Sequence, residues 1–186
     1  MRIAVLYRSK SGYTERYARW ISERLAADLL RVGDIRREDL APYGLVIYGA
    51  GLYAAGINGL KTLLRQLEAY PEKQLVVFAV GVTPARPEVV PELIAKNLPK
   101  PLQDKVPLFY LRGGFNAGRL TAVDRLLMAV LKLKLRLKPR LGPDERGMLA
   151  ACERPVDFTG AGQLTEIIAC VEALTGAGGG QAPDRA

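Results

Sequence analysis

Four short apolar runs, separated by longer segments of helical character, constrain the fold of this chain more than any other feature. They are IAVLY (3–7), GLVIYG (44–49), QLVVFAVG (74–81) and VPLFYL (106–111). Continuous rather than alternating apolar residues are typical of strands that are covered on both faces, as in a parallel sheet. Because a helix fits between successive runs, we expect an α/β domain with a doubly wound parallel sheet.

The segments between these runs carry apolar residues at helical spacing. The pattern places helices at 14–30, 60–70, 88–97, 120–138 and 164–174, and a short second strand at 32–35. Asn58 is the expected N-cap of the second helix, and Thr159 or Thr165 that of the last. Residues 131–138 alternate with a strand's period, so only the first part of 120–138 reads as helix. The total is five strands and about five helices.

The length of 186 residues suits one domain, which we place at 1–175. It includes a basic amphipathic insertion at about 115–145, and the glycine-rich tail 176–186 reads as disordered.

The composition excludes several kinds of chemistry. The chain has no histidine, which removes Ser-His and Cys-His pairs and the commonest general base and metal ligand. Its two cysteines, Cys152 and Cys170, are too few for a disulfide framework or a zinc site, and we expect both to pack as small core residues. There is no apolar run of ~20 residues and no secretory signal, so we expect a cytoplasmic protein. An enzyme of this composition would draw on a cofactor.

Four loops follow the predicted strands: 8–14, 49–58, 81–86 and 112–118. A doubly wound sheet binds its ligands beyond the carboxyl ends of the strands. The first loop combines three hydroxyls and a glycine, and it precedes a helix, whose N-terminus attracts anions. We therefore expect it to hold a phosphate monoester through Ser9, Ser11, Gly12 and Thr14.

Two known phosphate-binding motifs are excluded for this loop, and one alternative without a ligand remains open. It is not a Walker loop, because no Gly-Lys-Ser/Thr follows a glycine-rich stretch, and it is not the dinucleotide Gly-x-Gly-x-x-Gly. The alternative is a capped helix without a ligand, in which Ser11 is the cap and Glu15 lies in the first turn.

The pattern Ser9-x-Ser11-Gly12-x-Thr14 after an N-terminal strand resembles the phosphate loop of the flavodoxin family, although that family usually has threonine at the first two hydroxyl positions. YGAGLYAAGINGLK (48–61) and VGVTPARPE (80–88) look like the second and third flavin loops, and DFTG (157–160) looks like the end of that fold. The resemblance spans about residues 1–175. It implies a five-stranded parallel sheet of order 2-1-3-4-5 and flavin mononucleotide (FMN) as cofactor.

Within that superfamily the chain is most similar to the flavodoxin-like protoporphyrinogen oxidase group. The similarity lies in GAGLY (49–53), TPARPE (83–88) and GGFNAGRLTAVDRLLMAVLK (113–132). The last stretch is the most specific, because ordinary flavodoxins lack that insertion. Tyr53 stands where the group often has arginine, and the aromatic and basic residues that usually fill the turn are absent.

The resemblance also implies which residues bind the flavin. The first loop would hold the phosphate, the second would follow one edge of the isoalloxazine with Tyr53 stacked on it, and the third would cover the other side with Thr83 as a donor. Glycines after the last strand would permit close backbone approach. The implied residues are Ser9, Lys10, Ser11, Gly12, Tyr13, Thr14, Gly51, Leu52, Tyr53, Ala54, Gly81, Val82, Thr83, Gly113 and Gly114. An exposed Tyr53 without a flavin partner is the alternative.

Positive charge is concentrated in one segment of a chain whose formal charge is +8. Residues 119–141 hold seven basic residues and one acid, with apolar residues at helical spacing. Such a segment can contact an anionic substrate or a membrane surface, or it can be a solvated face. Nucleic acid is the weakest option, because no recognition motif or aromatic interleaving is present. The candidate contacts are Arg86, Arg119, Arg125, Lys132, Lys134 and Arg136.

Three functions remain open after these observations, of which the third is a non-enzymatic flavin-binding or membrane-associated module. The resemblance implies a quinone-linked dehydrogenase of protoporphyrinogen IX in haem biosynthesis, which transfers hydride to flavin N5 and electrons to a quinone, peripheral to the inner face of the membrane. The basic charge suits its anionic substrate better than it suits an acidic electron carrier. The alternative is a flavodoxin-type carrier or a general FMN quinone reductase. We name no catalytic residue, because no protein base is evident in the loops.

Overall fold

The computed structural model describes residues 1–53, 56–116 and 155–176, together with 129, 130, 133, 137 and 142. Five parallel strands form the central sheet: β1 (Ile3–Arg8), β2 (Asp28–Arg31), β3 (Leu45–Tyr53), β5 (Gln74–Gly81) and β6 (Leu108–Arg112). Their order is β2-β1-β3-β5-β6, which confirms the doubly wound sheet with strand order 2-1-3-4-5. A short β4 (Gly56–Ile57) pairs antiparallel with the end of β3.

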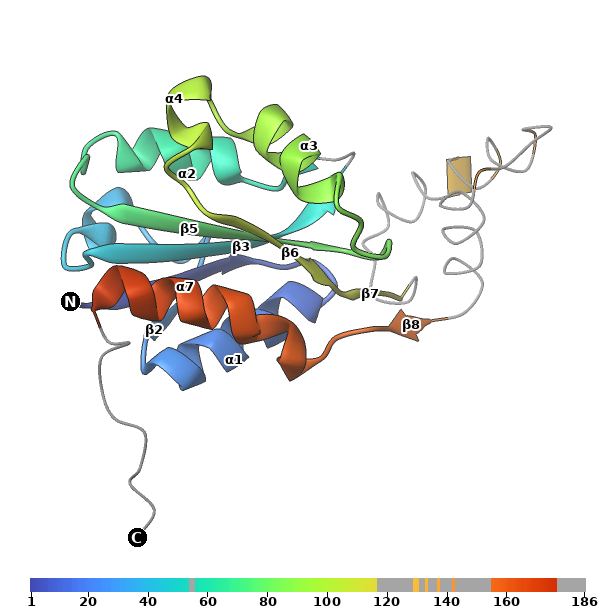
Figure 1. The fold of residues 1–186 in the computed structure, drawn as a ribbon, viewed down its shortest axis with the longest axis horizontal. Helices are drawn as coiled ribbons and strands as arrows, with labels where there is room; N and C mark the ends of the chain where they lie inside the picture. Colours follow the sequence, from blue (N-terminus) through green and yellow to red (C-terminus); the bar gives the residue numbers. More distant parts are fainter. Residues whose placement is uncertain are drawn as a thin grey trace, which may run out of the picture.

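Helices cover both faces of the sheet (Figure 1). On one face lie α2 (Leu60–Leu67), α3 (Val89–Asn97) and α4 (Lys100–Gln103), and on the other lie α1 (Tyr13–Leu25) and α7 (Thr165–Thr175). Short 3-10 turns occur at Arg37–Leu40 (η1) and Ala161–Leu164 (η3).

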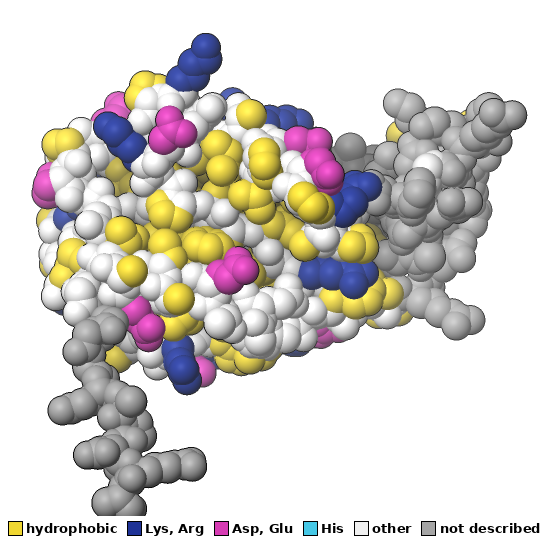
Figure 2. All heavy atoms as spheres, in the orientation of Figure 1, with side chains coloured by type: hydrophobic (Ala, Val, Ile, Leu, Met, Phe, Trp, Pro, Cys, Tyr) yellow, Lys and Arg dark blue, Asp and Glu magenta, His cyan; other side chains and the backbone are white. Residues whose placement is uncertain are grey.

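Successive residues of each strand enter different cores. In β1, Ala4 and Leu6 belong to the core under α2 and α3, whereas Val5 and Tyr7 belong to the core under α1 and α7. This alternation explains why the central strands are apolar throughout. The strand β6 forms the edge of the sheet opposite β2, and hydrophobic side chains gather over it in the space-filling view (Figure 2).

The boundary between the first helix and the second strand was predicted wrongly. The helix ends at Leu25 rather than at residue 30, because Ala26 adopts a left-handed conformation with φ of 47°. The second strand is Asp28–Arg31 rather than 32–35. Leu29 continues the helical spacing, but it pairs with Val5 in the sheet, so long-range strand pairing overrides the local pattern.

The predicted helix caps were also wrong. Gly59, not Asn58, is the N-cap of α2, and Gly12 holds the N-cap position of α1 that the alternative interpretation of the first loop gives to Ser11. Leu164 precedes α7, while Thr165 is its first residue. The structure adds β4 and α4, which the sequence did not predict, and the predicted helix 120–138 and the tail from 177 lie outside the continuous described ranges.

Two further short strands lie beyond the carboxyl end of β6. Residues Gly114–Phe115 (β7) pair antiparallel with Val156–Asp157 (β8), in the register Gly114↔Asp157 and Phe115↔Val156. We call this pair the stem, because it joins the two ends of the segment 117–154. The stem lies at the end of the sheet where the strands finish (Figure 1).

Candidate functional site

The first loop turns at Gly12 and leads directly into α1. Gly12 has φ of 89°, and its N–H donates to Ser9 Oγ at 3.0 Å. The carbonyl of Gly12 then accepts the N–H of Arg16 at 3.0 Å, which starts the helix. Side-chain capping by Ser11 is therefore replaced by a glycine turn. The turn leaves the N-terminus of a 13-residue helix at the edge of the sheet where a ligand is expected.

The charge of this loop suits an anion. Residues 9–14 include one cation, Lys10, and no acid. Glu15 follows in the first turn of α1, but its carboxylate pairs with Arg19 at 3.3 Å. The negative charge nearest to the loop is thus partly compensated by a neighbour on the same helix.

The first and second loops meet at Gly51. A Cβ built on Gly51 would lie 3.8 Å from Thr14 Oγ1, so the backbone at the end of β3 lies against a hydroxyl of the first loop. The Thr14 side chain is buried here. At the tip of the second loop, Tyr53 is 51% exposed, and Lys10 Nζ lies 5.1 Å from the centroid of its ring. Ala54 lies outside the described residues.

The third loop is held by two side chains of β6. The Tyr110 hydroxyl donates to the carbonyl of Thr83 at 2.7 Å and lies 3.1 Å from Thr83 Oγ1. Arg112 Nε donates to the carbonyl of Val82 at 3.2 Å. Gly81 is required beside them, because a Cβ there would collide with the Tyr110 hydroxyl. Tyr110 and Arg112 were not predicted as site residues, and their long-range bonds leave no local sequence signal.

Glycines 113 and 114 permit close approach of the protein's own chain. A Cβ on Gly113 would collide with the side chain of Val80, and one on Gly114 would meet the ring of Tyr13 and the carbonyl of Val156. Gly113 N–H donates to the carbonyl of Gly81 at 2.7 Å. The stem is therefore packed closely on the third loop and on the first residue of α1.

The stem is also bonded to α1 by polar contacts. The Tyr13 hydroxyl donates to the carbonyl of Val156 at 3.2 Å, and Arg16 pairs with Asp157 at 2.7 Å. Arg16 also donates to the Thr159 hydroxyl at 2.7 Å. Burial alone would raise the pKa of Asp157, but hydrogen bonds from Thr159 and Arg16 outweigh it and lower that pKa. The side chain of Tyr13 is thus bonded to the stem.

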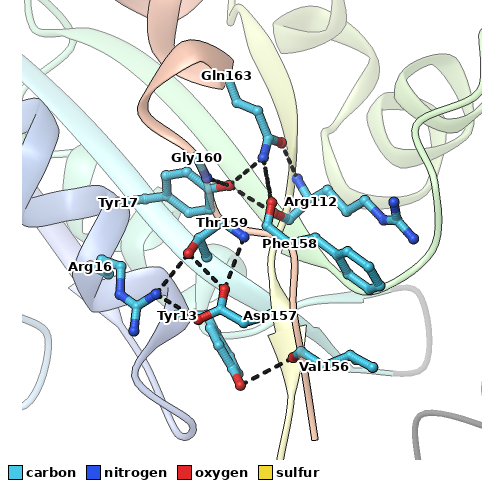
Figure 3. A network of polar contacts seen from close by, with 10 residues as sticks. All are labelled: Tyr13, Arg16, Tyr17, Arg112, Val156, Asp157, Phe158, Thr159, Gly160 and Gln163. Carbon is cyan, nitrogen blue, oxygen red and sulfur yellow. Dashed lines mark hydrogen bonds and ion pairs between the residues drawn. The ribbon is translucent and has the colours of Figure 1, made fainter.

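Beside the stem, the hydroxyl of Tyr17 is the centre of a partly buried network (Figure 3). It donates to the carbonyl of Arg112 at 2.6 Å and accepts from Gln163 Nε2 at 2.7 Å and from Gly160 N–H at 3.3 Å. Gln163 Oε1 in turn accepts the N–H of Arg112 at 2.7 Å. Burial raises the pKa of Tyr17. The network joins α1, β6 and η3, so Gly160 and Gln163 are fixed to the sheet.

The candidate contacts of the basic segment lie largely outside the described residues, namely Arg119, Arg125, Lys132, Lys134 and Arg136. Among the described residues of the segment, three large apolar side chains are exposed, those of Val130, Leu133 and Leu137. Leu137 N–H donates to the carbonyl of Leu133 at 3.1 Å, which is a helical contact. Arg86 is exposed in the third loop.

Several other expectations can be compared with the described residues. Cys170 is half-buried and burial raises its pKa, while Cys152 is not described. Within residues 1–53, 56–116 and 155–176, no group of three or more Cys, Asp or Glu side chains could hold a metal ion. No helix of the described part has the length and apolar composition that crossing a bilayer requires.

The fold and site define a doubly wound α/β domain with a phosphate-type loop at its first strand. The flavodoxin domain family matches residues 4–138, and the chain belongs to that family. FMN is therefore its cofactor, as the resemblance of the loops implied. The first loop fits this cofactor, because it offers a helix N-terminus, a lysine and no acid to a phosphate.

Solved structures of the same fold are only remotely similar. The Trp repressor binding protein of Bacillus subtilis is 19% identical, with 75% of this chain and 100% of that chain covered and a TM-score of 0.43. A flavodoxin from the domain Archaea is 14% identical (82% and 97% covered, TM-score 0.38). A flavoprotein from Lactobacillus acidophilus, in complex with FMN, is 16% identical (60% and 92% covered, TM-score 0.41). The comparison with curated proteins found no match.

Proposed function

We propose that this chain is an FMN-dependent oxidoreductase that oxidises an anionic substrate of the porphyrinogen type and passes the electrons to a quinone. The support is the sequence resemblance of residues 49–53, 83–88 and 113–132, together with the position of the stem. The stem is the observation that carries the proposal. It holds both ends of the segment 117–154 at the same edge of the sheet as the three flavin loops.

Each loop has a distinct task in this proposal. Residues Ser9–Thr14 would hold the phosphate of FMN, and Lys10 would offset its charge. Gly51, Leu52 and Tyr53 would contact the ring, with Tyr53 available for stacking because it is half exposed. Bound FMN supplies a two-electron acceptor that can also transfer single electrons. Tyr110 fixes the third loop, so the backbone around Thr83 is held in place before the cofactor binds.

The basic segment would recognise the substrate or the membrane that contains the quinone. Its cations, among them Arg119, Arg125, Lys132, Lys134 and Arg136, complement carboxylates and anionic lipid headgroups alike. Because the stem is bonded to Tyr13 and Arg16 of α1, the segment begins and ends beside the first loop. A substrate bound there would lie near the cofactor.

The test is anaerobic turnover of protoporphyrinogen IX with a menaquinone analogue as acceptor, using protein saturated with FMN. We expect quinone-dependent formation of protoporphyrin by the full chain. A variant in which residues 119–140 are replaced by a short Gly-Ser linker should bind FMN equally well but lose most of the activity.

Three results would contradict the proposal at different levels. Protein that takes up no FMN would exclude a flavin enzyme altogether. An FMN-loaded protein that reduces quinones from a nicotinamide donor, but does not oxidise the porphyrinogen, would indicate a general reductase. Full activity of the linker variant would show that the basic segment does not recognise the substrate.

A further inference from the structure

A groove of about 600 Å³ opens between α3 and the carboxyl ends of β3 and β6. Its volume lies within the range of ~300–1,000 Å³ that is typical of small-molecule sites. One wall is a single face of α3, because Val89, Leu93 and Lys96 follow one another at helical spacing. The opposite side is formed by Leu52 of β3 and Tyr110 of β6.

The interior of the groove is apolar and fixed in shape. Leu93 is buried at 4% exposure, while Leu52, Val89 and Tyr110 are partly buried. The ring of Tyr110 cannot turn freely, because its hydroxyl is bonded to the carbonyl of Thr83 at 2.7 Å and lies close over Gly81. An apolar ligand would therefore enter a largely preformed site.

The rim of the groove is charged, with a cationic excess. Arg86 and Lys96 contribute two positive charges, and Glu92 contributes one negative charge. All three side chains belong to exposed residues, so their charges act at the mouth rather than on the floor. An apolar floor under a cationic rim favours a ligand with an apolar body and one anionic group.

We propose that this groove binds a small organic acid, an aromatic or other apolar body that carries a carboxylate. The body would lie on Leu52, Leu93 and Tyr110, and the carboxylate would face Arg86 and Lys96. No function assigned above uses the α3 face of this site. Only the possible redox role of such an acid depends on the proposed function, since binding itself needs no flavin.

The groove is next to the flavin loops but distinct from the phosphate loop. It shares Leu52 with the second loop and Thr83 with the third, and none of residues 9–14 lines it. Because the phosphate loop does not line the groove, an acid bound there would lie beside the ring of FMN and leave the phosphate in place.

The experiment is a titration of the ¹⁵N-labelled full chain with 2-naphthoate, followed by amide chemical shifts, with and without saturating FMN. The neutral 2-naphthamide is the comparison ligand. We expect saturable shifts confined to residues 52, 83–96 and 110 and their neighbours, the same in both FMN states. The carboxylate should bind about three- to tenfold more tightly than the amide, because exposed ion pairs contribute modestly.

Three variants test the charge of the rim and the shape of the groove separately. The double variant Arg86→Gln, Lys96→Gln should lower the affinity for naphthoate to that of the amide. Its matched control, Lys61→Gln, Lys100→Gln, removes two exposed lysines that do not line the groove and should change nothing. Ala95→Trp, at an exposed position of the lining, should abolish binding of both ligands while the spectrum of the folded protein is retained.

The outcomes separate this proposal from the function proposed above. Naphthoate shifts at residues 9–14, displacement of naphthoate by FMN, equal affinity for the amide, or an effect of the control variant would each overturn it. Binding in the groove by a chain that takes up no FMN would support the groove and refute the flavin enzyme. FMN binding without saturable naphthoate binding would refute the groove proposal and leave the flavin enzyme supported.

Discussion

Gly12 is the residue on which the geometry of the first loop depends most. Its φ of 89° is a conformation that side-chain-bearing residues rarely adopt, and its N–H is bonded to Ser9. We expect Gly12→Ala to lower the free energy of unfolding by about 1–2 kcal/mol, from the strain of a left-handed backbone. FMN affinity should fall with it, because the start of α1 is displaced. Urea unfolding and quenching of flavin fluorescence measure the two effects.

The control for Gly12 is another glycine without such a constraint. Gly162 has no left-handed φ, and a Cβ there would meet nothing within 4 Å. Gly162→Ala should change the stability by less than about 0.5 kcal/mol and leave FMN binding unchanged. Equal losses in the two variants would show that the conformation of Gly12 is not the cause.

Tyr48 makes the folded protein less stable at alkaline pH. Burial raises the pKa of its hydroxyl to about 12, against a smaller lowering by Arg8, and the hydroxyl donates to the carbonyl of Asn58 at 2.5 Å. In the unfolded chain a tyrosine ionises near pH ~10. Between these values the unfolded state releases a proton that the folded state keeps. The folded state is therefore favoured fully below pH ~10 and loses about 2–3 kcal/mol as the pH rises to about 12.

Tyr48→Phe separates this effect from those of other tyrosines. At pH 8 the variant should be about 1 kcal/mol less stable than the wild type, because the hydrogen bond to Asn58 is lost. Between pH 10 and 12 the difference should shrink and then reverse, since phenylalanine does not ionise. Urea unfolding of both proteins at several pH values measures it. A difference that stays constant over this range would contradict the shifted pKa.

At the scale of elements, the sequence predicts the sheet better than the connections. The strands at 3–8, 45–53 and 74–81 are recognisable because each is apolar on both faces. The α1–β2 boundary is not recognisable, because Leu25 and Leu29 keep a helical spacing across a left-handed Ala26. Which of two local patterns is adopted depends on pairing with β1, which is a long-range contact.

In the candidate site, too, one part could be predicted from the sequence and another could not. The loops were predictable, because parallel strands bring their carboxyl ends to one edge. The stem and the network around Tyr17 were not, since Tyr17 and Gln163 are 146 residues apart and neither has a local signal. Short antiparallel pairs such as β7–β8 depend on the rest of the fold and carry little pattern of their own.

The Tyr17 network should stabilise the packing of η3 and α7 on the sheet. Tyr17→Phe keeps the ring but removes the hydroxyl that serves Arg112, Gly160 and Gln163. We expect a loss of about 2–3 kcal/mol, because three hydrogen bonds are lost, although Gln163 Nε2 still donates to the carbonyls of Arg112 and Phe158. The amide of Gly160 should also exchange faster with solvent. Urea unfolding and hydrogen exchange measure these effects.

Tyr70→Phe is the matched control for that substitution. The Tyr70 hydroxyl makes a 3.3 Å hydrogen bond to the carbonyl of Arg37 in an exposed position. Its removal should cost less than about 1 kcal/mol and leave exchange at Gly160 unchanged. If Tyr17→Phe were no more harmful than this control, the network would not be a source of stability.

At the scale of the whole molecule, the charge is distributed unevenly. The segment 119–141 holds seven basic residues and one acid, so the rest of the chain accounts for only +2 of the formal charge of +8. Exposed Val130, Leu133 and Leu137 lie in the same segment. Basic and apolar residues together are typical of a surface that binds anionic membranes peripherally. The stem would hold this surface beside the flavin loops.

This arrangement predicts salt-dependent binding of the full chain to vesicles. Each cation near an anionic surface contributes ~1 kcal/mol, so Lys132→Gln, Lys134→Gln, Arg136→Gln together should weaken binding to phosphatidylserine-containing vesicles about 100-fold. Co-sedimentation at 0.1 M and 0.5 M salt measures it, with phosphatidylcholine vesicles as the uncharged reference. The triple variant Arg24→Gln, Lys61→Gln, Arg65→Gln removes the same charge from exposed positions of α1 and α2 and should bind nearly as well as the wild type. Equal weakening by both variants would mean that total charge, and not the segment on the stem, attracts the membrane.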